Sequence, residues 1–172
     1  MKNWTFKKWN TVLGWGVFVI AFFTYLSTIE PNFSFWDCGE YISSAVKLEV
    51  THAPGAALFQ LVGAVAAIFG FGDPSKYSVI INAMSALFSA FTILFLFWTI
   101  THLVRRLLNR DFEEVSFTEE IAILFSGAVG ALCFAFSDTF WFSAVEGEVY
   151  AMASMFIALL RWLISKWENE YH

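Results

Sequence analysis

Charged residues are scarce in this sequence of 172 residues: they make up 15% of the chain, against roughly a quarter of a typical soluble domain. Hydrophobic residues make up 58% and aromatic residues 20%, and mean hydropathy is +0.62. Twenty-one phenylalanines and eight tryptophans are too many for a soluble core of this size. The composition excludes an ordinary soluble domain and predicts an all-α integral membrane protein.

Cysteine is almost absent, since the chain contains only Cys38 and Cys133, which lie in different segments. There is no CxxC pair and no spacing typical of a zinc site, so neither a disulfide framework nor a structural metal is predicted. Free cysteines of this kind are usually small buried hydrophobic residues. Internal repeats and low-complexity segments are also lacking, and no nucleic-acid partner is predicted.

Long apolar segments, by contrast, are abundant. Four of them approach the roughly 20 residues that a helix needs to cross the hydrocarbon core; they cover 11–29, 78–101, 119–137 and 149–165. The first follows a basic N-terminus, but it is longer than the hydrophobic region of a signal peptide, about 7–15 residues, and is predicted to be a retained span. A fifth segment, 55–72, is short, rich in alanine and glycine, and bracketed by prolines.

The distribution of positive charge decides whether 55–72 is a span or an interfacial or re-entrant helix. If it does not cross the membrane, eight of the ten lysines and arginines fall on the side of the N-terminus, and only Lys47 and Lys76 fall on the other. The positive-inside rule favours this arrangement, with both termini in the cytoplasm. We therefore predict a single membrane domain over 1–172, with four spans and a long outer segment over 30–77 that contains interfacial helices.

The outer segment contains the stretch "WDCGEYISSAVKL", which predicts a short amphipathic helix at the membrane surface. Its polar face is predicted from helical spacing and comprises Asp37, Glu40, Tyr41, Ser44 and Lys47. Asp-x-x-Glu at a helix start resembles a capping box, in which both carboxylates bind backbone N–H groups. Asp37 can instead act as a general base on a hydroxyl that arrives from the aqueous side. The two roles are compatible.

Two further motifs add ionisable groups on the same side of the membrane. His52, in "THAPG", is predicted to be either a partly exposed interfacial histidine or a site residue that contacts a phosphate or a carboxylate. Glu146 and Glu148 form an acid-x-acid motif just before the last span, where the helix dipole favours negative charge. Such a pair can also hold a divalent cation through oxygen ligands, or position a hydroxyl acceptor. No cofactor is assigned.

The stretch "FWDCGEYISSAVKLEVTHAPGAALFQLVGA" resembles the N-terminal signature of a family of large multispanning bacterial membrane proteins. Their eukaryotic relatives are protein O-mannosyltransferases of the endoplasmic reticulum, within the GT-C glycosyltransferase superfamily. Asp37 matches an early acidic residue of the family's first outer loop, and 52–55 matches a His-Pro-Pro stretch, with Ala53 in place of proline. The acid-x-acid motif at 146–148 is similar to one in oligosaccharyltransferases of the same superfamily.

This resemblance implies a GT-C-type helical bundle in the bacterial inner membrane. It also implies transfer of a sugar from a polyprenyl-phosphate donor to an exported protein, on the extracytoplasmic side. Asp37 would be the general base, with Glu40 and His52 orienting it or contacting the acceptor. Lys47 would pair with the donor phosphate. Because members of the family are far longer, the resemblance implies that this chain is an N-terminal part that is inactive alone.

The sequence is also compatible with two other classes of function. A transporter or channel fragment is one, although such a protein usually carries an acidic residue near a span centre, and Asp138 lies only at a span end. The other is a noncatalytic assembly subunit, in which the acidic residues cap helices. In that case, small residues would mediate helix packing, namely Gly63, Ala67, Gly127 and Gly130.

Overall fold

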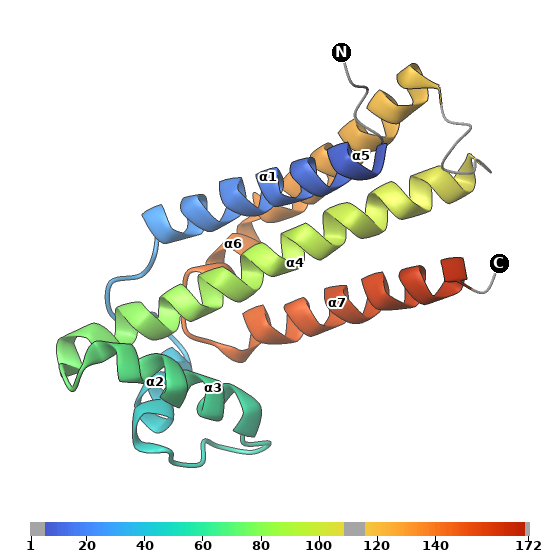
Figure 1. The fold of residues 1–172 in the computed structure, drawn as a ribbon. Helices are drawn as coiled ribbons and strands as arrows, with labels where there is room; N and C mark the ends of the chain where they lie inside the picture. The colour runs from blue at the N-terminus through green and yellow to red at the C-terminus, as the bar shows by residue number, and fades with distance from the viewer. Residues whose placement is uncertain (1–5, 109–115, 171–172) are drawn as a thin grey trace.

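A computed structural model of the chain describes residues 6–108 and 116–170, and within this part the chain is helical and has no strand (Figure 1). The helices are α1 (Phe6–Ser27), α2 (Cys38–Lys47), α3 (Ala57–Ala67), α4 (Tyr77–Leu107), α5 (Phe117–Ala135), α6 (Asp138–Ala144) and α7 (Val149–Glu170). Two short 3₁₀ turns, η1 (Ile68–Gly70) and η2 (Pro74–Lys76), connect α3 to α4. The prediction of an all-α membrane protein is confirmed.

Four helices are long and apolar enough to cross a membrane, as predicted: α1, α4 with the preceding η2, α5 and α7. The predicted boundaries differ from the observed ones by several residues, because α1 begins at Phe6 and α4 continues to Leu107. α4 lies at the centre of the bundle and contacts α1, α5 and α7. More than half of its apolar window is buried, while the other three spans keep most of theirs exposed.

Small residues let the helices approach α4 closely. A Cβ atom added at Gly127 of α5 would lie 2.5 Å from Cγ2 of Thr101, and one added at Gly130 would lie 2.8 Å from Cδ1 of Ile100. At Gly63 of α3, an added Cβ would lie 2.9 Å from the Cβ of Ala45 in α2. These contacts are of the kind that drives helix association in membranes, where lipid and side chains are equally apolar.

The fifth apolar segment forms α3 and η1, which together end at Gly70 and are too short to be a candidate span. After η1, Phe71 and Gly72 adopt positive φ angles and turn the chain. Asp73 then accepts a hydrogen bond from the backbone N–H of Ser75 and starts η2, which leads into α4. The prediction of four spans rather than five agrees with this geometry.

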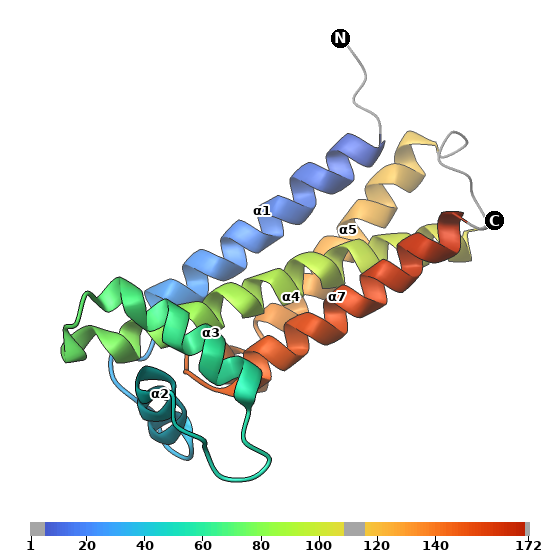
Figure 2. The same ribbon diagram turned by 60° about the horizontal axis from the view of Figure 1, so that its bottom comes forward.

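The helices alternate in direction and therefore divide the bundle into two ends (Figures 1 and 2). α2 and α3 lie at one end, together with the segment that leads into α7; this is called the loop end below. The start of α1, the end of α4, the start of α5 and the end of α7 lie at the opposite end, called the terminal end. All the acidic residues singled out above, and His52, therefore gather at the loop end.

Candidate functional site

The start of α2 does not form the predicted capping box. Asp37 occupies the N-cap position, but its side chain makes no capping hydrogen bond. Glu40 turns away from the helix start and accepts two hydrogen bonds from His52, which lies 12 residues further along the chain. The capping prediction for these two side chains is therefore wrong, and the Asp37 carboxylate is not occupied by the backbone of its own helix.

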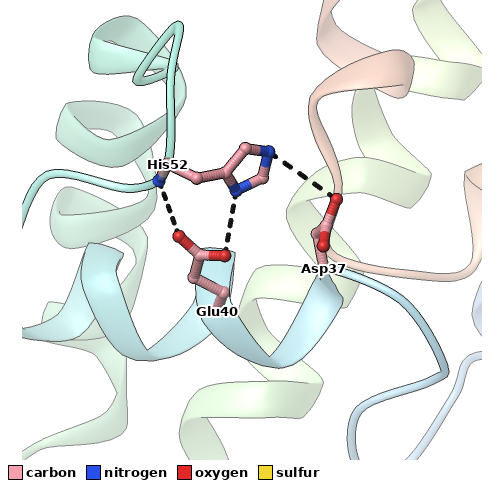
Figure 3. A group of neighbouring side chains, drawn as sticks. All are labelled: Asp37, Glu40 and His52. Atoms are coloured by element: carbon pink, nitrogen blue, oxygen red, sulfur yellow. Dashed lines mark hydrogen bonds and ion pairs between the residues drawn. The ribbon is translucent and has the colours of Figure 1, made fainter.

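Asp37, Glu40 and His52 come together as one cluster (Figure 3). The backbone N–H of His52 donates to Oε1 of Glu40 at 2.7 Å, and its ring Nδ1 lies 2.9 Å from Oε2. The other ring nitrogen, Nε2, faces Oδ2 of Asp37 at 3.8 Å. Glu40 thus fixes both the position and the ring orientation of His52, and the ring in turn faces the Asp37 carboxylate.

The charges in this cluster support one another. The hydrogen bond that the His52 ring donates to Glu40 is the main cause that raises the pKa of His52 above its usual value. The negative charges of Glu40 and Asp37 raise it further. The bonds from the His52 backbone and ring lower the pKa of Glu40. All three side chains are about half exposed, so solvent screens these interactions and can reach the Asp37 carboxylate.

The acid-x-acid motif lies in the segment between α6 and α7, and unlike the cluster it is buried. Glu146 is 3% exposed and Glu148 is 6% exposed. The Ser34 hydroxyl donates a hydrogen bond to Oε2 of Glu146. Burial raises the pKa of Glu146, and burial together with the charges of Glu146 and Asp37 raises the pKa of Glu148 to about 7. The negative charge of Asp37 therefore reaches Glu148 in the second outer segment.

Gly147 explains why the two acidic residues can enter this position. A Cβ atom at Gly147 would lie 2.9 Å from Oδ1 of Asn82 and 3.1 Å from side-chain atoms of Ile42 and Ile81. Only a glycine lets the backbone pass between α2 and α4 at this distance. The segment is thereby held against the start of α2, with one carboxylate on either side of the glycine.

Asn82 is a structural residue of the site that the sequence reasoning missed. It is fully buried in α4, and its Nδ2 donates hydrogen bonds to the backbone carbonyls of Glu30 and Asn32, at 2.8 and 3.0 Å. These bonds fasten the chain that leads from α1 to Asp37. An asparagine inside an otherwise apolar span was the available signal, because polar residues in spans are costly and usually have a role.

The predicted polar face of α2 is only partly correct. Tyr41 and Ser44 are buried, because α3 covers this side of the helix. The ring of Tyr41 lies 6.0 Å from that of His52 and 5.7 Å from that of Phe59 in α3. Lys47 is exposed in the last turn of α2, about 15 Å along the helix from Asp37, and the structure does not bring it into the cluster.

The cluster also has the composition of a metal site, since one ligand atom from each of Asp37, Glu40 and His52 lies within 4.8 Å of the others. Two carboxylates and an imidazole suit a divalent transition metal. However, both Glu40 oxygens already bind His52, so a metal would have to displace these two hydrogen bonds. The side chains thus form a hydrogen-bonded charge cluster rather than a preformed metal cage.

Comparison with known proteins identifies the family of this chain. Residues 37–172 match the family model described as the protein O-mannosyl-transferase TMEM260 N-terminal domain. The protein O-mannosyl-transferase tmem260 of Dictyostelium discoideum is 28% identical over 150 residues, which cover 86% of this chain and 16% of the relative. TMEM260 of Mus musculus is 30% identical over 152 residues, covering 88% and 18%. The chain thus spans less than a fifth of the curated relatives it matches. No solved structure matches it significantly.

Proposed function

Because this chain belongs to the TMEM260 N-terminal domain family of protein O-mannosyl-transferases, we propose that it forms the acceptor-activating part of a mannosyltransferase. The observation that carries this proposal is the state of Asp37. Its carboxylate makes no capping bond, is half exposed and faces a histidine ring that Glu40 holds in place. A group with this exposure and orientation fits a general base better than a structural cap.

The proposed reaction is a single displacement. The Asp37 carboxylate takes the proton of a protein hydroxyl as its oxygen forms a bond to the anomeric carbon of the sugar. The bond between that carbon and the donor phosphate breaks, and the polyprenyl phosphate leaves with the bonding electron pair. Such a phosphate needs little assistance from an acid, so the main task of the protein is to position and deprotonate the acceptor. The product has inverted configuration at the anomeric carbon.

Each neighbouring group has a role in this proposal. His52 orients Asp37 through Nε2, and Glu40 holds the ring from the opposite side. The buried pair, Glu146 and Glu148, shapes the field behind Asp37 and positions the acceptor. Lys47 is proposed to meet the donor phosphate from the far end of α2, on the exposed side of the loop end.

We further propose that the bundle is of the GT-C type and that the loop end faces the extracytoplasmic side. The excess of lysine and arginine at the terminal end supports this orientation. The bacterial inner membrane remains a prediction, since the two relatives reported above are eukaryotic. In the four described spans, acidic residues lie only towards helix ends, at Glu119, Glu120, Glu168 and Glu170, so a transport path through a span centre has no support.

Asp37→Asn in the full-length protein tests the proposal. We expect sugar transfer from a polyprenyl-phosphate donor to fall by about 100-fold or more, the usual contribution of a general base. Membrane insertion and monodispersity should remain unchanged, because Asp37 makes no capping bond. Asp73→Asn is the matched control: Asp73 is also a partly exposed carboxylate between α2 and α4, but it bonds only Ser75 and Lys76. Transfer at a near wild-type rate in Asp37→Asn would exclude the role of base.

A further inference from the structure

The terminal end of the bundle carries a cationic cluster between α4 and α7, far from the site described above. It comprises Arg105 and Arg106 in the last turn of α4, and Arg161 and Lys166 in α7. An ion pair between Arg106 and Glu168 joins the two helices. These four cations outnumber the acidic residues of the same two helix ends, Glu168 and Glu170. Positive charge is therefore in excess at this point of the helix interface.

Helix length places this cluster at the level of lipid headgroups. α4 has 31 residues and is about 46 Å long, while the hydrocarbon core is about 30 Å thick, so its last turn reaches the headgroup region. Arg161 lies nearer the core, about 18 Å along α7 from Val149. A guanidinium at that depth must extend towards the headgroups or meet an anion.

Aromatic rings flank the cluster on its membrane side. The ring of Trp162 lies 5.2 Å from Trp98 and 5.4 Å from Phe95, and the Lys166 ammonium lies 4.9 Å above the Trp162 ring. Trp98 is fixed by a hydrogen bond from its Nε1 to the backbone carbonyl of Asn10 in α1. Tryptophans commonly mark the boundary between hydrocarbon and headgroups, which agrees with the depth inferred from helix length.

An apolar stripe runs along α7 up to the cationic cluster. Ile157, Leu160 and Ile164 are exposed and follow helical spacing, so they lie on one face together with Arg161. Among the residues whose side chains the structure describes, Arg161 forms no ion pair. A guanidinium within an exposed aliphatic stripe, near further cations at the helix end, matches an amphiphile: the stripe suits acyl chains, and the cations suit an anionic head.

We propose that the surface formed by the ends of α4 and α7 binds an anionic phospholipid through its headgroup phosphate. Arginine presents a planar fork of donors that binds phosphate oxygens with two hydrogen bonds, and Arg161 lies where such a fork would meet the phosphate. Lys166 adds a second positive charge from the next turn of α7. The apolar stripe favours a lipid over a soluble phosphate as the occupant. This binding is separate from the proposed sugar transfer at the loop end.

Native mass spectrometry of the full-length protein tests this site. The probes are phosphatidylglycerol, phosphatidylcholine and, as soluble anions, inorganic phosphate and glycerol 3-phosphate. We expect the wild-type protein to retain phosphatidylglycerol in preference to phosphatidylcholine, and Arg161→Gln and Lys166→Gln each to weaken retention about fivefold. Arg161→Lys should keep only part of it, because the charge remains but the planar fork of donors is lost. Both side chains are exposed, so these variants should fold.

Lys76→Gln is the matched control, because it removes one exposed lysine charge at the loop end, where Lys76 pairs with Asp73. Retention in this variant should equal that of the wild type. Equal retention of the two lipids, unchanged retention in Arg161→Gln, or an equal loss in Lys76→Gln would overturn the proposal. Displacement of phosphatidylglycerol by inorganic phosphate or glycerol 3-phosphate would also overturn it and indicate a soluble anion as the ligand. Each readout is lipid binding, so none depends on sugar transfer.

Discussion

Two helices of this protein begin with the same spacing of polar residues but use it differently. At the start of α5, the Ser116 hydroxyl accepts from the backbone N–H of Glu119, and the Glu119 carboxylate accepts from the backbone N–H of Ser116, which completes a capping box. At the start of α2, Asp37 and Glu40 have the same separation, yet neither side chain caps the helix. Glu40 binds His52 instead.

The difference shows that the spacing of polar residues determines which capping bonds a helix start can form, but not which bonds it does form. His52 offers Glu40 a charged donor and a backbone N–H at once, and charge-assisted hydrogen bonds are stronger than those to neutral amides. At Ser116, by contrast, each side chain of the pair binds the backbone N–H of the other residue. α2 then depends on packing for its stability, since Cys38, Ile42 and Ala45 are buried against its neighbours. The interactions of the Asp37 and Glu40 side chains can therefore be changed without a large effect on the stability of α2.

The largest effect on the α2 start is expected from His52→Ala. Without the ring, Asp37 loses the group that orients it, and we expect transfer by the full-length protein to fall about 100-fold in kcat, as for a misplaced reacting group. Glu40 is then free to turn back to the helix start, so the free energy of unfolding should change little. His52→Gln, which can still donate to Glu40, should recover part of the rate.

The pH–rate profile separates this positioning role from a purely structural one. Because Glu40 and Asp37 raise the pKa of His52, its ring loses the proton above the usual histidine range, and the wild-type rate should fall there. This alkaline limb should be missing in His52→Ala. A stable variant with an unchanged rate and an unchanged profile would contradict the orienting role.

Glu148→Gln tests a third helix start, that of α7. There, the effect of burial on the pKa of Glu148 outweighs that of the helix dipole, which favours the charged carboxylate. The pKa of Glu148 is raised to about 7, so the folded protein binds a proton more tightly than the unfolded chain. Stability therefore falls as pH rises from about 4.5 to 7 and stays low above that. We expect the substitution to stabilise the protein at pH 8 by on the order of 2 kcal/mol.

Thermal unfolding in detergent at pH 5 and pH 8 measures this effect. Glu148→Gln should reduce the difference between the two pH values, because it removes the group that loses its proton. Glu120→Gln is the control, since Glu120 is a partly exposed acidic residue in the first turn of α5. An unaltered pH dependence in Glu148→Gln would show that another group is responsible.

More of the fold than of the site could be predicted from the sequence. The four spans follow from apolar length alone, and the short segment that became α3 follows from its length and the charge bias. The pairing of Glu40 with His52 could not be predicted, because it depends on how the chain returns between α2 and α3. Nor could the burial of Tyr41 and Ser44, which follows from the packing of α3 on α2. The local spacing of residues indicates which interactions a side chain can make, whereas tertiary contacts determine which of these interactions forms.

The smallest effects on stability are expected from Ser116→Ala at the start of α5 and Asp37→Ala at the start of α2. Loss of an N-cap hydroxyl costs about 1 kcal/mol, so Ser116→Ala should destabilise the protein by roughly that amount while transfer persists. Asp37→Ala removes no capping bond and should change stability by less than about 0.5 kcal/mol, although it abolishes the proposed base. Unfolding midpoints and transfer rates of both variants provide the measurement. If Asp37→Ala destabilised the protein as much as Ser116→Ala, Asp37 would act as a cap after all, and the two helix starts would be alike.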